Sequence, residues 1–167
     1  YVLLNKGLKV KKNASLVSGG KGVTFFLTAS NLEEAKDLNP LKVESNDKPT
    51  DVSRVKLSAP TDQNDPYRGI LMFQDMRVQG EKKSSPGDWG GKIELKKEKG
   101  NVGQTLELNG LIHAPSISLE IGDGGEFISD RLLFVVRKVK IGKNAEMKLN
   151  PTTLPDGTPF RRVTLIR

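Results

Sequence analysis

The chain has 167 residues with 17 glycines, 9 prolines and only 5% aromatic residues, a balance that suits short strands and tight turns better than a helical bundle. It contains no cysteine, which excludes a disulfide framework and a thiolate metal site, and no apolar run approaches the ~20 residues that span a bilayer. The net charge of +7 raises the question of nucleic acid, but the lysines are mixed with glutamates and aromatic stacking platforms are missing, so we expect no nucleic-acid partner.

The first residues, "YVLL", form an apolar run that starts at Tyr1 rather than at a methionine. We interpret the sequence as a fragment whose native N-terminus was removed or processed. A signal or membrane anchor would then lie upstream of it. The length of the chain fits one domain over residues 1–167.

A phrase at 8–16, "LKVKKNASL", recurs as "LEIGDGGEF" at 119–127 and as "VKIGKNAEM" at 139–147. All three open on apolar, charged and apolar residues, continue through turn residues and close on a large apolar residue. The last two are offset by 20 residues, about one turn of a β-solenoid. We expect alternate residues such as Leu119 and Ile121 to stack in the interior, and Glu120 to face solvent. The turn residues tolerate positive φ: Asn13, Gly122, Gly124, Gly125 and Asn144.

The repeat predicts an all-β, single-stranded, right-handed parallel β-helix. The alternative is an antiparallel β-sandwich, in which Gly and Asn turns also separate alternating strands. Runs such as "ILMF" and "LLFVV" are expected of strands that are covered on both faces. The other strand candidates are 22–29, 54–60, 68–75, 105–114, 131–138 and 160–167.

Two segments interrupt the strand pattern. At 30–54 a capping box of Ser30 and Glu33 opens a short helix that stops at Pro40, and polar residues follow, which predicts a helical or irregular insertion. The second, 78–92, is rich in Gly, Ser and Pro and contains Trp89. Insertions on one face of a solenoid are common binding sites. The segment at 92–100, "KIELKKEKG", predicts a solvated strand face with salt bridges. "YVLLNKG" and "PFRRVTLIR" are the candidates to cover the two ends.

Residues that could carry chemistry are sparse. His113 is the only histidine, which argues against a zinc site, and no serine has a positioned base, so we expect His113 to be buried or in a turn. β-Helix lyases and hydrolases need clustered acids, and Asp75 with Arg68 or Arg77 is the best such candidate. Against it, "TDQNDP" at 61–66, with Asp62 and Asp65, is a plain turn sequence, and Asp75 could simply pair with Arg77. We therefore expect no catalytic, cofactor-binding or metal-ligating residues.

The phrases "GVTFFLTASN", "VKLSAPTDQNDPYRGILMFQDMR" and "LNGLIHAPSISLEI" occur in this order along the chain. In that order they resemble the C-terminal region of TadG-like proteins of the Flp/Tad (tight adherence) pilus-assembly class. "GILMFQDMR" is the most specific match; His113 stands where the family usually has tyrosine. The resemblance implies the outer part of a bacterial envelope protein with an N-terminal membrane anchor, linked to pili or adhesion. It supplies no catalytic residues.

The leading functional hypothesis is a non-enzymatic structural or adhesive domain outside the cytoplasm, in the periplasm or at the cell surface. Its partners would be other pilus-assembly or envelope proteins, or surface glycans, with Trp89, Asp75 and Arg77 as contact residues. One alternative is a polysaccharide lyase or hydrolase that uses Asp75 with Arg68 or Arg77. Another is a self-associating solenoid that stacks end to end through uncovered turns.

Overall fold

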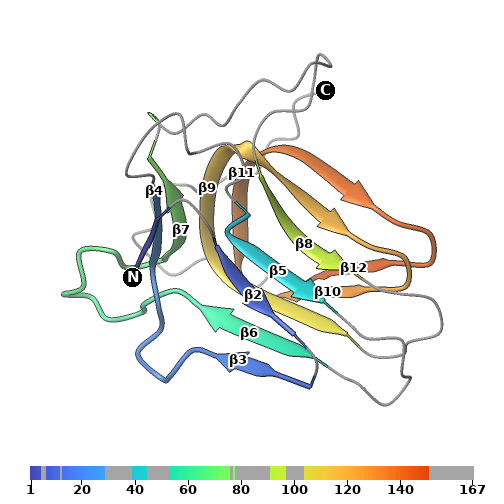
Figure 1. Ribbon diagram of the computed structural model, residues 1–167. Coiled ribbons are helices and arrows are strands. Elements are labelled where there is room, and N and C mark those ends of the chain that lie inside the picture. The colour runs from blue at the N-terminus through green and yellow to red at the C-terminus, as the bar shows by residue number, and fades with distance from the viewer. Residues whose placement is uncertain are drawn as a thin grey trace.

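The protein is an all-β parallel solenoid in the computed structural model (Figure 1). The structure describes residues 1–4, 7–11, 13–28, 39–44, 53–75, 77, 91–96 and 104–150. Every strand pairing among them is parallel, so the predicted parallel β-helix is confirmed and the antiparallel sandwich is wrong. The strands are β1 (Val2–Leu4), β2 (Leu8–Val10), β3 (Ser15–Val17), β4 (Phe25–Thr28), β5 (Leu41–Glu44), β6 (Arg54–Ser58), β7 (Ile70–Gln74), β8 (Lys92–Lys96), β9 (Thr105–Ile121), β10 (Glu126–Ser129), β11 (Leu132–Ile141) and β12 (Glu146–Leu149).

The pairings arrange the strands into three faces. Face 1 contains β3, β6, residues 105–109 of β9, β10 and β12. Face 2 contains β1, β4, β7, residues 110–114 of β9 and residues 132–136 of β11. Face 3 contains β2, β5, β8, residues 118–121 of β9 and residues 138–141 of β11. The long strands β9 and β11 therefore bend from one face into the next, as the curved ribbons of Figure 1 show.

The interior is built from apolar residues that stack in register from turn to turn. On face 3, Leu41, Ile93 and Leu119 lie in one row, each at most 1% exposed. On face 1, Val55, Leu106 and Phe127 form the equivalent row and are fully buried. Alternation along each strand sends every second side chain into this core. The 2-residue period of the sequence therefore determines which residues are buried.

The three copies of the recurring sequence phrase form equivalent turns, each of which connects face 3 to face 1. Asn13, Gly124 and Asn144 have φ values of 56°, 63° and 56° at equivalent positions. In each copy the residue after the one with positive φ donates its backbone N–H to the carbonyl oxygen three residues before it. The N···O distance is 3.1 Å for Ala14, 3.0 Å for Gly125 and 3.3 Å for Ala145. Because Asn and Gly tolerate positive φ, all three copies adopt the same turn. The predicted equivalence of the three phrases is confirmed.

The predicted insertion at 30–54 is wrong for residues 41–44 and for Arg54, which belong to strands. Residues 41–44 form β5, in the middle of face 3, and Arg54 begins β6. Four residues between polar stretches give too short an alternating pattern to predict a strand reliably. The predicted helix after Ser30 and the polar stretch at 45–52 lie outside the described residues, as does the C-terminal candidate strand at 160–167. The predicted insertion at 78–92 lies outside them over 78–90, with Trp89, and its last residue, Lys92, begins β8.

The part of the chain that the structure describes contains no helix that is long and apolar enough to cross a membrane.

Candidate partner-binding surface

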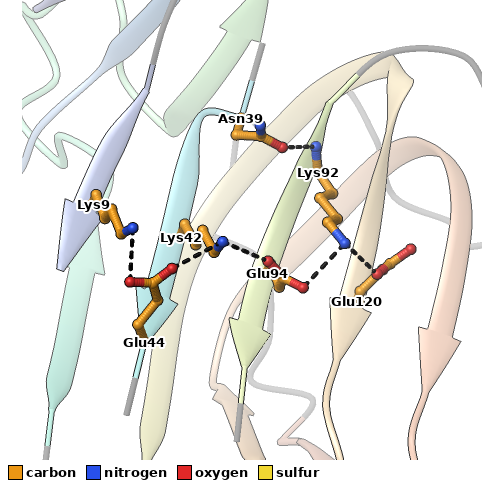
Figure 2. Close-up of polar contacts among 7 residues, drawn as sticks. All are labelled: Lys9, Asn39, Lys42, Glu44, Lys92, Glu94 and Glu120. Atoms are coloured by element: carbon orange, nitrogen blue, oxygen red, sulfur yellow. Dashed lines mark hydrogen bonds and ion pairs between the residues drawn. The ribbon is translucent and has the colours of Figure 1, made fainter. Parts of the chain in front are cut away.

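The outer side of face 3 carries a ladder of ion pairs across successive turns (Figure 2). Glu44 binds Lys9 at 2.8 Å and Lys42 at 2.9 Å. Lys42 also reaches Glu94, at 3.7 Å. Lys92 continues the ladder to Glu94 at 3.0 Å and to Glu120 at 3.1 Å. This is the solvated, salt-bridged strand face that "KIELKKEKG" predicts, and that prediction is confirmed for residues 92–96.

The ladder shifts the pKa values of its members. Hydrogen bonds from Lys42 and then Lys9 lower the pKa of Glu44 from 4.5 to about 2. The hydrogen bond to Glu44 raises the pKa of Lys42. Burial lowers the pKa of Lys92, but its bonds to Glu94 and Glu120 outweigh burial, and the net change is upward. Each charge in the ladder therefore already has a partner within the chain, which leaves this face little need for an external one.

The outer side of face 1 is also polar. Lys56 pairs with Glu107 at 2.8 Å, and Lys148 pairs with Glu126 at 2.5 Å and Glu146 at 2.9 Å. The outer sides of faces 1 and 3 thus both carry ion pairs between neighbouring turns.

Face 2 differs from both, because its outer side is apolar. One row crosses all of its strands, with Val2 beside Phe26, Phe26 beside Phe73, Phe73 beside His113 and His113 beside Val135. The row reaches solvent at both ends, where Val2 is 62% and Val135 43% exposed.

The rings in this row stack on one another. The Phe26 and Phe73 ring centroids are 5.9 Å apart with an interplanar angle of 11°, and those of Phe73 and His113 are 5.1 Å apart at 17°. Stacked rings turn their faces toward each other and their edges toward solvent. Because sugars are bound through CH contacts with exposed ring faces, this geometry suits apolar protein side chains better than glycans.

A second row runs beside the first. Ile70, Leu111 and Leu133 are paired across three turns and are partly exposed, and they point away from the interior, where Ile112 is buried. This explains why "ILMF" and "LLFVV" are continuous apolar runs: both sides of these strands are apolar. We call the two rows together the apolar stripe; it consists of Val2, Phe26, Ile70, Phe73, Leu111, His113, Leu133 and Val135.

Asp75 and Arg77 follow directly on β7 and form a polar cluster next to the stripe. The Asp75 carboxylate accepts from Arg77 Nη2 at 2.6 Å, from the Arg77 backbone N–H at 3.0 Å and from Thr28 Oγ1 at 3.2 Å. Arg77 holds the pKa of Asp75 well below its usual range. The Arg77 side chain is itself 78% exposed.

The predicted site residues have different outcomes. Asp75 and Arg77 are brought together, in the pairing that weighed against a catalytic role, and a lowered pKa is the opposite of what a general acid needs. Asp62 and Asp65 cap the turn at 61–66 by accepting from the backbone N–H groups of Asn64 and Tyr67 at 2.9 and 2.8 Å, so the plain-turn interpretation is confirmed. Arg68 lies in the turn that follows, with its N–H bound to the Asp65 carbonyl. Among the described residues no three His, Asp or Glu side chains gather as metal ligands.

His113 lies on a strand, partly buried in the stripe and stacked on Phe73, and its Nδ1 has no hydrogen-bond partner. Sequence reasoning missed the row to which it belongs. The only signal is that Phe26, Phe73, His113 and Val135 occupy one position in four strand segments, which is visible once the register is known.

No protein-family model matches the chain, and neither a curated protein nor a solved structure is significantly similar to it.

Proposed function

We propose that this chain is a non-enzymatic structural domain that docks a partner protein through the apolar stripe. The observation that carries the proposal is the contrast among the outer faces: two carry ion pairs across neighbouring turns, and one carries a continuous apolar row that is exposed at Val2, Phe26 and Val135. Contiguous apolar side chains that reach solvent are a common mark of a protein interaction site. Arg77, which pairs with Asp75 but is exposed beside the stripe, can in addition donate to an acidic residue of the partner.

The cellular setting is proposed from the resemblance to TadG-like pilus-assembly proteins. In that setting the domain lies outside the cytoplasm, is tethered by an upstream anchor, and docks pilus-assembly or other envelope proteins during adhesion. The ring edges of the stripe support a protein partner over a surface glycan. The pairing of Asp75 with Arg77 and Thr28 supports a scaffold over a carbohydrate-active enzyme.

The test is complementation with a stripe variant. The variant Val2→Ser/Phe26→Ser/Val135→Ser changes exposed positions outside the core, so we expect it to fold, with some loss of stability from the missing Phe26–Phe73 stacking. The matched control, Ser15→Ala/Arg54→Ser, changes exposed positions on the outer side of face 1. Each is introduced into the full-length gene, and surface display, piliation and adhesion are measured in cells that lack the native copy.

We expect the stripe variant to reach the same protein level as the control but to lose adhesion or piliation. Equal adhesion by the two variants would overturn the docking role of the stripe. Retention of the full-length protein in the cytoplasmic fraction would overturn the envelope setting.

A further inference from the structure

A lysine, a glutamate and an asparagine contact one another on the outer side of face 1. Lys56 Nζ lies 2.8 Å from Glu107 Oε1, and Asn109 Nδ2 donates to the same oxygen at 3.3 Å. One carboxylate oxygen therefore holds both nitrogens. Lys56 is paired with Glu107 across β6 and β9, and Asn109 follows two residues later on β9. Lys56 and Asn109 are thus diagonal neighbours on adjacent turns, a separation that a long side chain spans.

The side-chain carbonyl oxygen of Asn109 is held by three donors. It accepts from the backbone N–H of Asp130 at 2.9 Å, from Ser129 Oγ at 3.1 Å and from the backbone N–H of Arg131 at 3.3 Å. The two backbone donors fix which end of the amide is the oxygen, so Nδ2 is the end that faces Glu107. Donors aimed at a carbonyl oxygen stabilise the negative charge that develops when a nucleophile attacks its carbon. The amide of Asn109 is therefore activated as an electrophile.

The surroundings of the ion pair are partly apolar. In its row across face 1, Val17 lies beside Lys56 and Ile128 lies beside Glu107. The side chain of Glu107 is only 13% exposed, whereas that of Lys56 is 44% exposed. Because little water reaches the carboxylate, its contacts with the two nitrogens are stronger than they would be in bulk solvent.

We propose that this cluster is a modification site, in which Lys56 and Asn109 form an isopeptide bond between two turns of the solenoid. Glu107 takes a proton from the Lys56 ammonium group, and the freed amine attacks Asn109 Cγ. The three donors then stabilise the oxyanion of the tetrahedral intermediate. Glu107 carries two protons in turn from Nζ to Nδ2, the Cγ–Nδ2 bond breaks, and the nitrogen leaves as ammonium. One C–N bond replaces another, Glu107 ends as the carboxylate, and nothing is oxidised or reduced.

Such a bond would join β6 to β9 covalently. The chain contains no cysteine, so a disulfide cannot connect its turns. An isopeptide bond would close the loop of residues 56–109 and restrict the unfolded chain, as a disulfide does. This inference stands independently of the apolar stripe and its partner.

A competing reaction attacks the same carbon and also releases ammonia. In it the backbone nitrogen of Gly110 closes a ring onto Asn109 Cγ. In the folded protein that N–H donates to the Arg131 carbonyl at 2.6 Å, which holds the nitrogen away from the attack. The experiment must nevertheless distinguish the two products.

Intact-mass spectrometry of the purified full chain tests the proposal. After incubation at 37 °C we expect the wild type to be lighter than its sequence mass by one ammonia. Fragmentation of a tryptic digest should then identify one branched peptide that joins residues 56 and 109, because trypsin does not cut after an acylated lysine. On a denaturing gel the cross-linked chain should run ahead of an unlinked variant, because its unfolded chain keeps a closed loop.

Three variants test the roles of the residues. Lys56→Arg keeps a cation beside Glu107 but supplies no free amine, and Glu107→Gln keeps the side-chain shape but cannot carry the protons. Both should retain the full sequence mass. The matched control is Lys148→Arg, which changes another lysine of face 1 that pairs with glutamates and should cross-link as the wild type does.

A wild type that keeps its full sequence mass throughout the incubation would overturn the proposal. So would a loss of ammonia that persists in Lys56→Arg, because that product is the ring formed with Gly110, or a branched peptide that joins other residues. Cross-linking of Glu107→Gln at the wild-type rate would overturn the role assigned to the carboxylate.

Discussion

Faces 2 and 3 share one backbone path and one interior, yet their outer sides are opposites. Inside, Ile112 of face 2 and Leu119 of face 3 are equally buried. Outside, face 3 joins lysine and glutamate in ion pairs across turns, whereas face 2 stacks Phe26, Phe73 and His113. The difference shows that a parallel solenoid restricts which residue types occupy its inward rows but not its outward rows. Outward residues contact only their neighbours in adjacent turns.

The two outer rows also differ in their contributions to the free energy of folding. Surface ion pairs contribute little to stability, but they keep a long sheet solvated. Exposed apolar side chains forgo about 25 cal/mol for each Å² left in water, which makes a continuous apolar row hard to explain unless a partner covers it. The comparison therefore supports the proposal that face 2 binds a partner while face 3 stays in solvent, and four experiments probe the difference between the two faces.

The largest loss of stability is expected for substitutions in the interior, where faces 2 and 3 should lose similar amounts of unfolding free energy. Ile112→Ala and Leu119→Ala each remove a buried branched side chain from a closely packed row, so each should lower the free energy of unfolding by about 2–5 kcal/mol. Denaturant titration measures both. Val135→Ala, at an exposed position of face 2, is the control and should change stability by less than about 0.5 kcal/mol. A large difference between the two core variants would refute a uniform interior.

A smaller effect is expected in the aromatic row. Phe73 stacks on Phe26 on one side and on His113 on the other, so Phe73→Ala should cost about 1–3 kcal/mol of unfolding free energy. Phe26→Ala loses one stacking contact at a more exposed position and should cost about half as much. Thermal and denaturant unfolding of both variants checks the ratio. Equal losses would show that stacking does not order this row.

The pH dependence of the protein's stability should come from face 3. Glu44 has a pKa of about 2 in the folded protein against an ordinary 4.5. A lowered carboxyl pKa stabilises the fold above the ordinary value, and this contribution is lost as the pH falls from about 4.5 towards 2. We expect the melting temperature of the wild type to drop more steeply over this range than that of Glu44→Gln. Parallel curves for the two proteins would show that the ladder adds no pH-dependent stability.

The smallest effect is the response of monomer stability to salt. Raising NaCl from 0.05 to 1 M at pH 7 should screen the face 3 ladder and lower the unfolding free energy by less than about 1 kcal/mol. The variant Lys42→Met/Glu94→Met, which removes the ion pairs Lys42–Glu44, Lys42–Glu94 and Lys92–Glu94, should lose most of this response. The stripe variant Val2→Ser/Phe26→Ser/Val135→Ser should keep all of it, because none of its positions carries a charge. A stronger response in the stripe variant would contradict the separate roles of the two faces.

Part of the fold could be predicted because its signals are local. The turn geometry at Asn13, Gly124 and Asn144 follows from residues that tolerate positive φ, and the 20-residue offset follows from counting. Strand β5 could not, because four residues such as "LKVE" fit several structures until β2 and β8 pair with them. The pairing of Asp75 with Arg77 was accessible as a hypothesis because the two residues are close in sequence.

The sequence by itself determined that the chain forms alternating strands, that its recurring phrases are equivalent corners, and that lysine and glutamate share a strand face. Only the tertiary structure decided which distant residues share a row. Phe26 and His113 are 87 positions apart in the sequence, and they join one aromatic row because parallel register stacks equivalent positions of successive turns. The physical reason is that periodicity along a strand sets which side a residue faces, whereas the lengths of the intervening corners and insertions set which residue lies beside it.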